Sequence, residues 1–195
     1  MGGELARVVQ ARFPKHVIGI HAFRGQETVV LKREGLLELA RFLRDDPAMR
    51  FDFLMDLSAV DYLKFGKSQS SRPTLVTPSP LPYYMTPKPV TETWTRGVSD
   101  DEHRFDVVYY VYSSVHNHRL RVKVPLTTAD PVVDSLTGLW EAANWFEREV
   151  WDMFGIRFTG HPNLKRILMY EGFNGHPLRK DYPIRKRQPL IGPLN

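Results

Sequence analysis

Apolar and polar positions alternate in two parts of the N-terminal third, and each part predicts β-structure. Residues 16–23 and 27–32 are rich in β-branched side chains and are separated by residues 24–26, which predicts a hairpin with a three-residue loop that contains a glycine. Residues 51–57 predict a strand with one strongly apolar face. That face is formed by Phe51, Phe53, Met55 and Leu57.

Three other stretches follow the spacing of a helix. Residues 4–12 predict a short helix that ends before Pro14, and residues 36–43 predict a second helix. A third helix is predicted from about 137 to 154, with Ser135 or Thr137 as its N-cap and Gly155 as its C-terminal stop. Its core-facing stripe is formed by Leu139, Ala143, Phe146, Val150 and Met153.

The clearest hairpin joins residues 105–113 to residues 120–126, where apolar side chains alternate with Arg121 and Lys123. Before it, residues 66–100 contain six of the 15 prolines and show no periodicity, which is typical of an insertion between two strands. The element order is therefore α-β-β-α-β-(insertion)-β-β-α. This order predicts a single α+β domain over residues 1–155 with a mixed or antiparallel sheet, followed by an extended arm over residues 156–195.

The arm is the basic part of the chain. Residues 156–195 hold eight Lys and Arg against two acidic residues, whereas the other 155 residues hold 19 basic and 20 acidic groups. Three prolines, at 183, 189 and 193, prevent a helix there. A basic, extended segment of this kind predicts an anionic partner, such as nucleic acid, lipid headgroups or an acidic protein surface.

Composition excludes several classes of site. The chain has no cysteine, so it cannot form disulfides, thiolate zinc sites or cysteine-ligated iron–sulfur clusters. It contains no apolar run of about 18 residues that could span a bilayer. Its first residues carry charges in place of the apolar region of a secretory signal.

The candidate metal ligands do not form a complete set. His116 and His118 lie in a predicted hairpin loop without a third ligand, and Asp56 and Asp61 bracket a strand end, where a turn-forming role is favoured. His161 and His176 are each followed by proline, which favours structural turns. We therefore expect no metal site on this chain.

Glu147 and Glu149 suggest paired carboxylate chemistry, but they lie about 200° apart around a helix and cannot share one substrate or ion. Arg148 and Asp152 are four residues apart and are expected to pair on the face opposite the core stripe. We interpret the end of this helix and the following basic segment as a partner-docking surface with no catalytic residues. Its candidate residues are Glu147, Arg148, Glu149, Asp152, His161, Lys165, Arg166, His176, Arg179, Lys180, Asp181 and Tyr182.

The segment EREVWDMFGI, followed by HPNLKRIL and GHPLRKDYP, resembles the signature of the 30-kDa (C) subunit of proton-pumping NADH:quinone oxidoreductase, respiratory complex I. The resemblance is dense over 137–184 and looser elsewhere; the 66–100 insertion is longer than usual in that family. It implies a non-redox structural subunit that is an enzyme only as part of the complex. Its expected partners are the large quinone-site subunit and a neighbouring iron–sulfur subunit.

The same resemblance implies that flavin and iron–sulfur clusters belong to partner subunits and that this chain carries no cofactor. It also implies a peripheral membrane protein, attached only through the complex, on the cytoplasmic side of a bacterial inner membrane or on the matrix side of a mitochondrial one. Three alternatives stay open: an equivalent subunit of a membrane-bound hydrogenase or ferredoxin-linked dehydrogenase, a basic nucleic-acid-binding protein using residues 157–187, and a stand-alone metalloenzyme using His116, His118 and the acidic helix. The leading interpretation includes no nucleic-acid partner.

Overall fold

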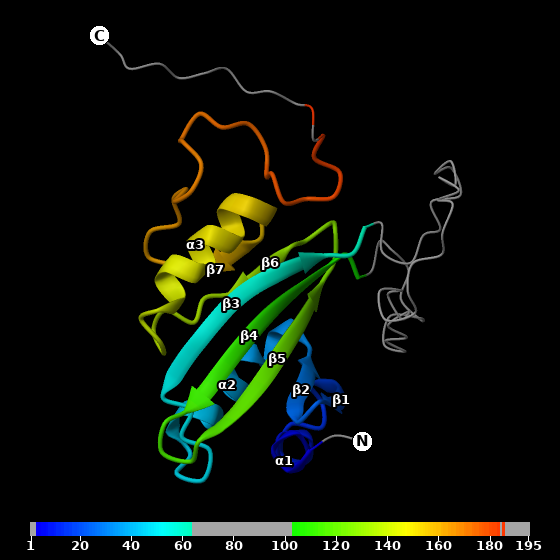
Figure 1. The fold of residues 1–195 in the computed structure, drawn as a ribbon, viewed down its shortest axis with the longest axis vertical. Coiled ribbons are helices and arrows are strands. Elements are labelled where there is room, and N and C mark those ends of the chain that lie inside the picture. The colour runs from blue at the N-terminus through cyan, green and yellow to red at the C-terminus, as the bar shows by residue number, and fades with distance from the viewer. Residues whose placement is uncertain (1–2, 64–102, 184, 186–195) are drawn as a thin grey trace, which may run out of the picture.

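Five strands form one mixed sheet in the order β1-β2-β5-β4-β3 (Figure 1). The computed structural model describes residues 3–63, 103–183 and 185, so the predicted insertion at 66–100 lies outside the described residues. The pairing of β2 with β5 is parallel, and the other three pairings are antiparallel. The strands are β1 (Val17–Phe23), β2 (Gln26–Leu31), β3 (Phe53–Asp61), β4 (Phe105–Ser113) and β5 (His118–Leu126).

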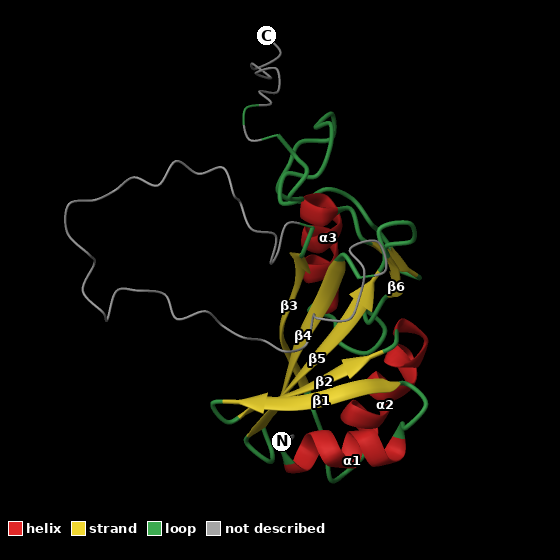
Figure 2. Cartoon of the chain, turned by 90° about the vertical axis from the view of Figure 1, so that its right-hand side faces the viewer, coloured by secondary structure: helices red, strands yellow, loops and turns green. Residues whose placement is uncertain are grey.

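The described helices supply apolar side chains to a core on one face of this sheet, with α1 and α2 seen on the same side in Figure 2. A short 3₁₀ turn, η1 (Arg33–Gly35), leads directly into α2. The α-helices are α1 (Glu4–Arg12), α2 (Leu36–Asp45) and α3 (Ala143–Phe154). The predicted α+β class and mixed sheet are confirmed.

The first hairpin is tighter than predicted. Strand β1 ends at Phe23 and β2 begins at Gln26, so the loop has two residues, not three. Both of them, Arg24 at φ 51° and Gly25 at φ 80°, adopt left-handed backbone conformations. This is the geometry of a type I′ turn, whose twist matches that of the flanking strands.

Strand β3 buries only part of the apolar face predicted for 51–57. Phe51 and Leu57 are buried as predicted, but Phe53 is 55% exposed and Met55 is 38% exposed, and Leu54 is buried in their place. The cause is a bulge between Leu54 and Asp56, where one additional residue shifts the register against β4. A bulge breaks the two-residue period, so strict alternation assigns the wrong side chains to the core.

Helix α3 begins at Ala143, six residues later than predicted, and neither Ser135 nor Thr137 caps it. The preceding residues form turns through N–H groups of Leu139 and Trp140 that bind the Leu136 carbonyl. They are held there because the indole of Trp140 is buried and donates to the Phe51 carbonyl at 3.1 Å. The predicted stop at Gly155 is confirmed by its left-handed φ of 73°.

A second, two-stranded parallel sheet joins β6 (Val132–Asp134) to β7 (Arg157–Thr159). The sequence pattern predicted no regular element after Gly155, and β7 corrects that prediction. Strands of three residues are too short to produce a recognisable alternation, and their pairing depends on a partner far away in the chain.

Candidate docking site

Residues 156–183, called here the C-terminal segment, fold back against α3 (Figure 1, orange to red). After β7 the segment has little regular structure, and it turns at Gly160 and Gly175, which have φ values of 81° and 111°. Polar contacts to α3 and to the ends of β3 and β4 hold it in place. Two clusters of buried charge provide most of these contacts.

The first cluster, the Asp152 cluster, centres on a fully buried carboxylate near the end of α3. One oxygen accepts an ion-paired hydrogen bond from Arg166 Nη1 at 2.5 Å. The other oxygen accepts three consecutive backbone N–H groups, from residues 167, 168 and 169, at 3.1, 2.9 and 2.8 Å. One side chain of the helix thus fixes four residues of the C-terminal segment.

The pKa of Asp152 lies below its usual value despite burial. Burial alone would raise the pKa, but the N–H of Met169, the guanidinium of Arg166 and the N–H groups of Leu168 and Ile167 outweigh it by stabilising the carboxylate. Asp152 is therefore a buried, ionised acceptor at neutral pH. Its role is to organise the backbone around it.

The expected pair between Arg148 and Asp152 does not form. Arg148 instead donates from Nε to the Lys165 carbonyl at 3.1 Å and from Nη2 to the Arg166 carbonyl at 3.2 Å. The two side chains lie on the same side of α3, but both oxygens of Asp152 are already occupied by Arg166 and by three backbone N–H groups. Arg166, 14 residues later in the chain, takes the position of ion partner.

The second cluster, the Arg104 cluster, ties the C-terminal segment to the start of β4. Arg104 is buried and forms ion pairs of 2.9 Å with both Asp61 and Asp181. Asp61 also accepts the backbone N–H of Lys180 at 2.9 Å. The guanidinium of Arg179 donates to the Phe154 carbonyl and lies 5.4 Å from the ring centre of Phe105.

Burial and neighbouring charges in the Arg104 cluster shift the pKa values of Asp61 and Arg179. Burial would raise the pKa of Asp61, yet hydrogen bonds from Arg104, Lys180 N–H and Leu63 N–H hold it below its usual value. Burial, with repulsion from Arg104, lowers the pKa of Arg179. Arg104 therefore holds two carboxylates, one from β3 and one from the C-terminal segment.

Both candidate histidines of the segment contact backbone carbonyls of α3. His161 Nε2 lies 3.2 Å from the Asn144 carbonyl, and His176 Nδ1 lies 3.0 Å from the Asp152 carbonyl. Gly155 is necessary for this approach, because a Cβ there would lie 2.6 Å from the imidazole of His176. Among the residues that the structure describes, no group of three His, Cys, Asp or Glu could hold a metal ion.

Glu147 and Glu149 point in different directions, as helix geometry predicts. Glu149 is exposed, whereas Glu147 is fully buried and accepts the Leu136 N–H at 2.7 Å through Oε1. Burial raises the pKa of Glu147 to about 7, although the Ser135 hydroxyl and the Leu136 N–H act in the other direction. Its other oxygen, Oε2, has no hydrogen-bond partner among the described residues. Glu147 is therefore part of the core and is not on the docking surface.

Replacing Glu147 with Gln should flatten the dependence of stability on pH. The folded protein holds the proton up to about pH 7 and the unfolded chain only to 4.5, so stability is full below 4.5 and falls as pH rises through 7. The loss is about 3 kcal/mol, at about 1.4 kcal/mol per pKa unit. Urea unfolding of the wild type and of Glu147→Gln at pH 5 and pH 8 measures this loss of stability. Glu149→Gln is the matched control, and equal pH dependence in wild type and Glu147→Gln would contradict the assignment.

Several candidate docking residues are exposed beside apolar neighbours. Lys165 and Lys180 are exposed, and Leu168 and Leu178 are 57% and 50% exposed. The backbone N–H groups of these two leucines bind Asp152 and Met153, which are consecutive residues of α3. The leucines therefore project from a backbone that α3 holds in place.

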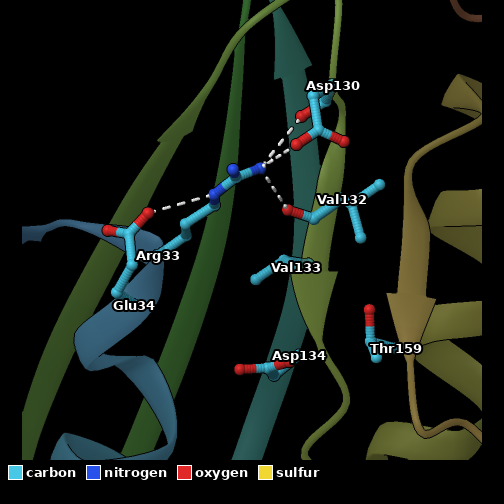
Figure 3. Close-up of a pocket in the computed structure, with 7 residues that line it drawn as sticks. All are labelled: Arg33, Glu34, Asp130, Val132, Val133, Asp134 and Thr159. Atoms are coloured by element: carbon cyan, nitrogen blue, oxygen red, sulfur yellow. Dashed lines mark hydrogen bonds and ion pairs between the residues drawn. The ribbon is translucent and has the colours of Figure 1, made fainter.

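A shallow cavity of about 240 Å³ lies away from these clusters, between η1 and the β6–β7 sheet (Figure 3). The guanidinium of Arg33 lines this cavity. It forms ion pairs with Asp130 at 2.6 Å and with Glu34 at 3.1 Å, and it donates a long hydrogen bond to the Val132 carbonyl at 3.5 Å. Its other lining residues are Val133, Asp134 and Thr159. The contacts connect the loop before β6 to η1, so we interpret the cavity as structural.

The predicted hairpin histidines also make internal contacts. His116 Nε2 lies 3.0 Å from the Pro47 carbonyl and His118 Nε2 lies 2.9 Å from the Met49 carbonyl. Both therefore connect the β4–β5 hairpin to the turn after α2.

Sequence reasoning missed Arg104 and gave Asp61 only a turn-forming role. Asp61 does accept the N–H of Leu63 at 3.0 Å, as in such a turn, but its main partner lies 43 residues away. No local pattern signals a pair at that separation. The two residues flank the predicted insertion at 66–100, five residues before it and four residues after it.

Comparisons with known proteins place this architecture in a family. The family described as "Respiratory-chain NADH dehydrogenase, 30 Kd subunit" matches residues 29–188, which is most of the chain. The chain belongs to this family. The predicted resemblance to the 30-kDa subunit of complex I is therefore confirmed.

Relatives in this 30-kDa subunit family match over nearly the full chain. The C subunit of NADH-quinone oxidoreductase from Citrifermentans bemidjiense is 40% identical over 189 residues, which cover 96% of this chain and 94% of the relative. Its counterpart of the same name from Roseiflexus sp. strain RS-1 is 42% identical over 176 residues, covering 90% and 80%. The family membership thus rests on the whole domain as well as on the C-terminal motifs.

Two solved structures are similar in fold. A trypsin-resistant fragment of Nqo5 matches with a TM-score of 0.55 and 32% identity, covering 82% of this chain and 98% of that chain. A chain of an archaeal membrane-bound sulfane sulfur reductase matches with a TM-score of 0.61 at 16% identity, covering 93% and 85%, and shows the fold alone. Within residues 3–63 and 103–183, no helix combines the length and apolar character needed to cross a membrane.

Proposed function

We propose that this 30-kDa-family chain is a non-redox structural subunit of the peripheral arm of an NADH:quinone oxidoreductase. In this proposal the C-terminal segment docks to the large quinone-site subunit and to a neighbouring iron–sulfur subunit. Electron transfer from NADH to quinone, coupled to proton translocation, takes place on those partners. Because the chain has no cysteine, it cannot supply thiolate ligands, so the iron–sulfur clusters are assigned to other subunits, and the proposal places the flavin there as well.

The observation that carries the proposal is the pair of exposed leucines, Leu168 and Leu178, on a backbone fixed by α3. Apolar side chains on a rigid surface lose little entropy when a partner covers them, so they are suited to an obligate interface. Exposed Lys165 and Lys180 lie close to them in the chain and supply polar contacts at the rim. Asp152, Arg166 and Arg179 support this surface from within.

Names of the relatives favour a quinone-linked complex over a hydrogenase or a ferredoxin-linked dehydrogenase. The proposed location is the cytoplasmic side of a bacterial inner membrane, or the matrix side in a mitochondrion, with attachment only through partner subunits. No nucleic-acid partner is included, because the basic side chains Arg166 and Arg179 of the segment are engaged within the chain.

The double substitution Leu168→Ser with Leu178→Ser should lower incorporation of this subunit into the membrane complex by at least about tenfold, because two anchor residues of an interface are lost. Both side chains are half exposed, so the stability of the isolated chain should change by less than about 0.5 kcal/mol each. Native gel electrophoresis of membranes that produce the tagged variant measures the incorporation.

Val115→Ser is the matched control, since Val115 is 54% exposed in the β4–β5 loop, on a different part of the chain. It should be incorporated like the wild type. Normal incorporation of the double variant would show that these leucines are not docking anchors.

A further inference from the structure

None of the described helices covers the second face of the five-stranded sheet, called here the open face, because they lie on the other side (Figures 1 and 2). On β5, the core-facing residues Leu120 and Val122 alternate with Arg119, Arg121 and Lys123, which therefore point to the open face. On β4, Tyr110 and Tyr112 point the same way, because their neighbours Tyr109 and Val111 are buried in the core.

Strand register places these side chains in two adjacent rows. The first row runs from Phe53 through Tyr112 to Arg119. The second runs from Asp56 through Tyr110, Arg121 and Thr28 to His21, across all five strands. Because successive residues on one face of a strand are about 6.6 Å apart, the two arginines form a short cationic stripe along β5.

The guanidinium of Arg121 is held in a defined orientation. Its Nε donates to Thr28 Oγ1 at 2.8 Å, its Nη1 donates to the Tyr110 hydroxyl at 3.2 Å, and its Nη2 lies 3.4 Å from His21 Nε2. The Tyr110 ring centre lies 5.9 Å from its central carbon. Such an arginine is preorganised and loses little freedom when it binds a carboxylate.

Neither arginine is paired with an acidic side chain of the described residues. In that part of the chain, Arg119 and Arg121 form no ion pair, whereas Lys123 lies 3.9 Å from Asp106. Arg119 packs on Tyr112, with its central carbon 5.7 Å from the ring centre. Phe53, 55% exposed, completes this row with an apolar side chain. Tyrosine, arginine and phenylalanine are the residues enriched in the cores of protein interfaces.

The size of this face is also suited to a protein partner. The five strands contain 7, 6, 9, 9 and 9 residues. At about 3.3 Å per residue and about 4.8 Å between strands, they offer roughly 600 Å², which approaches one side of a standard interface.

We propose that this open face is a second docking surface, which receives an acidic segment of a partner protein. Two carboxylates about 6–7 Å apart would pair with Arg119 and Arg121, and an apolar side chain beside them would contact Phe53. The positive charge of Arg119 and Arg121, which is not balanced by an ion pair among the described residues, favours an acidic partner. This surface is distinct from the C-terminal segment, so it does not depend on the leucine anchors proposed above.

Photo-crosslinking on the full chain in its native membranes tests the proposal. Phe53 is replaced by p-benzoylphenylalanine, the membranes are irradiated, and the crosslinked peptide is identified by mass spectrometry. We expect a peptide of another protein with at least two Asp or Glu near the attachment point. Adding Arg119→Glu should lower the crosslink yield at least about tenfold, because a reversed charge repels the acidic segment.

Arg41→Glu, an exposed residue of α2, is the control and should leave the yield unchanged. The side chain of Arg119 makes no hydrogen bond or ion pair with the described residues, so its substitution should not affect folding; thermal unfolding verifies this. The proposal is overturned by no crosslink, by crosslinks only to residues 64–102 of this chain, by a nuclease-sensitive adduct, or by a yield that Arg119→Glu does not change. Incorporation of the Leu168→Ser with Leu178→Ser variant tests the first docking surface separately, so the failure of one proposal can be distinguished from the failure of the other.

Discussion

Replacing Asp152 with Ala is expected to lower the free energy of unfolding by about 3–5 kcal/mol. The substitution leaves Arg166, with a side chain only 13% exposed, without its ion partner. It also removes the acceptor of three consecutive N–H groups, from residues 167–169. Urea unfolding followed by circular dichroism measures the loss.

Hydrogen exchange gives the local readout for the same variant. The amides of residues 167–169 should exchange faster by a much larger factor than those of β4, because the C-terminal segment loses its connection to α3 while the sheet keeps its core. Glu149→Ala, on the exposed side of the same helix, should change stability by less than about 0.5 kcal/mol. A similar small loss for Asp152→Ala would mean that the segment is held mainly by its apolar contacts.

Replacing Arg104 with Ala should destabilise the protein by about 3 kcal/mol, because the buried carboxylate of Asp61 loses its charge partner. Asp181, on the C-terminal segment, loses the same partner, so the Lys180 amide should lose protection from exchange. The pKa of Asp61 should rise, because burial is then opposed only by two backbone N–H groups.

A double-mutant cycle with Asp61→Ala separates the pair from its surroundings. If the two residues act together, the double variant should lose less stability than the sum of the single variants, with an interaction energy of about 1–3 kcal/mol. Additive losses would show that Arg104 and Asp61 stabilise the fold independently of each other. Arg157→Ala, at an exposed position of β7, serves as the reference for removing an arginine.

The parts of the fold that were predicted correctly rest on unbroken local patterns. Leu120, Val122, Val124 and Leu126 alternate without interruption in β5, and all four are buried. Gly155 ends α3 as predicted, because glycine adopts the left-handed conformation that terminates a helix at no steric cost. Local chemistry was sufficient in both places.

Predictions failed where a distant contact overrides the local pattern. The bulge in β3 exposes Phe53 and Met55 and buries Leu54, and it is visible only as a register shift against β4. The late start of α3 follows from the Trp140 indole binding the Phe51 carbonyl, a contact across 89 residues. Neither effect leaves a trace in the nearby sequence.

The candidate docking residues were found as a group, but the sequence could not divide them by function. Glu147 and Asp152 are buried, and Arg166 and Arg179 serve internal contacts, whereas Lys165 and Lys180 are exposed. The high density of charged residues in the sequence indicates that this segment has a special role, but not which role each residue has. Burial decides whether each charge supports a surface or forms part of it.

The α+β element order, the family and the basic C-terminal segment follow from the sequence alone, because they depend on local periodicity, motif and composition. The folded structure was needed to show that this segment binds α3 through Asp152 and the start of β4 through Arg104. It was also needed to show that no described helix covers the sheet face of Arg119 and Arg121, which form no ion pair among the described residues. An ion pair or a strand register joins residues that are far apart in the chain. Their spacing becomes defined only when the chain has folded.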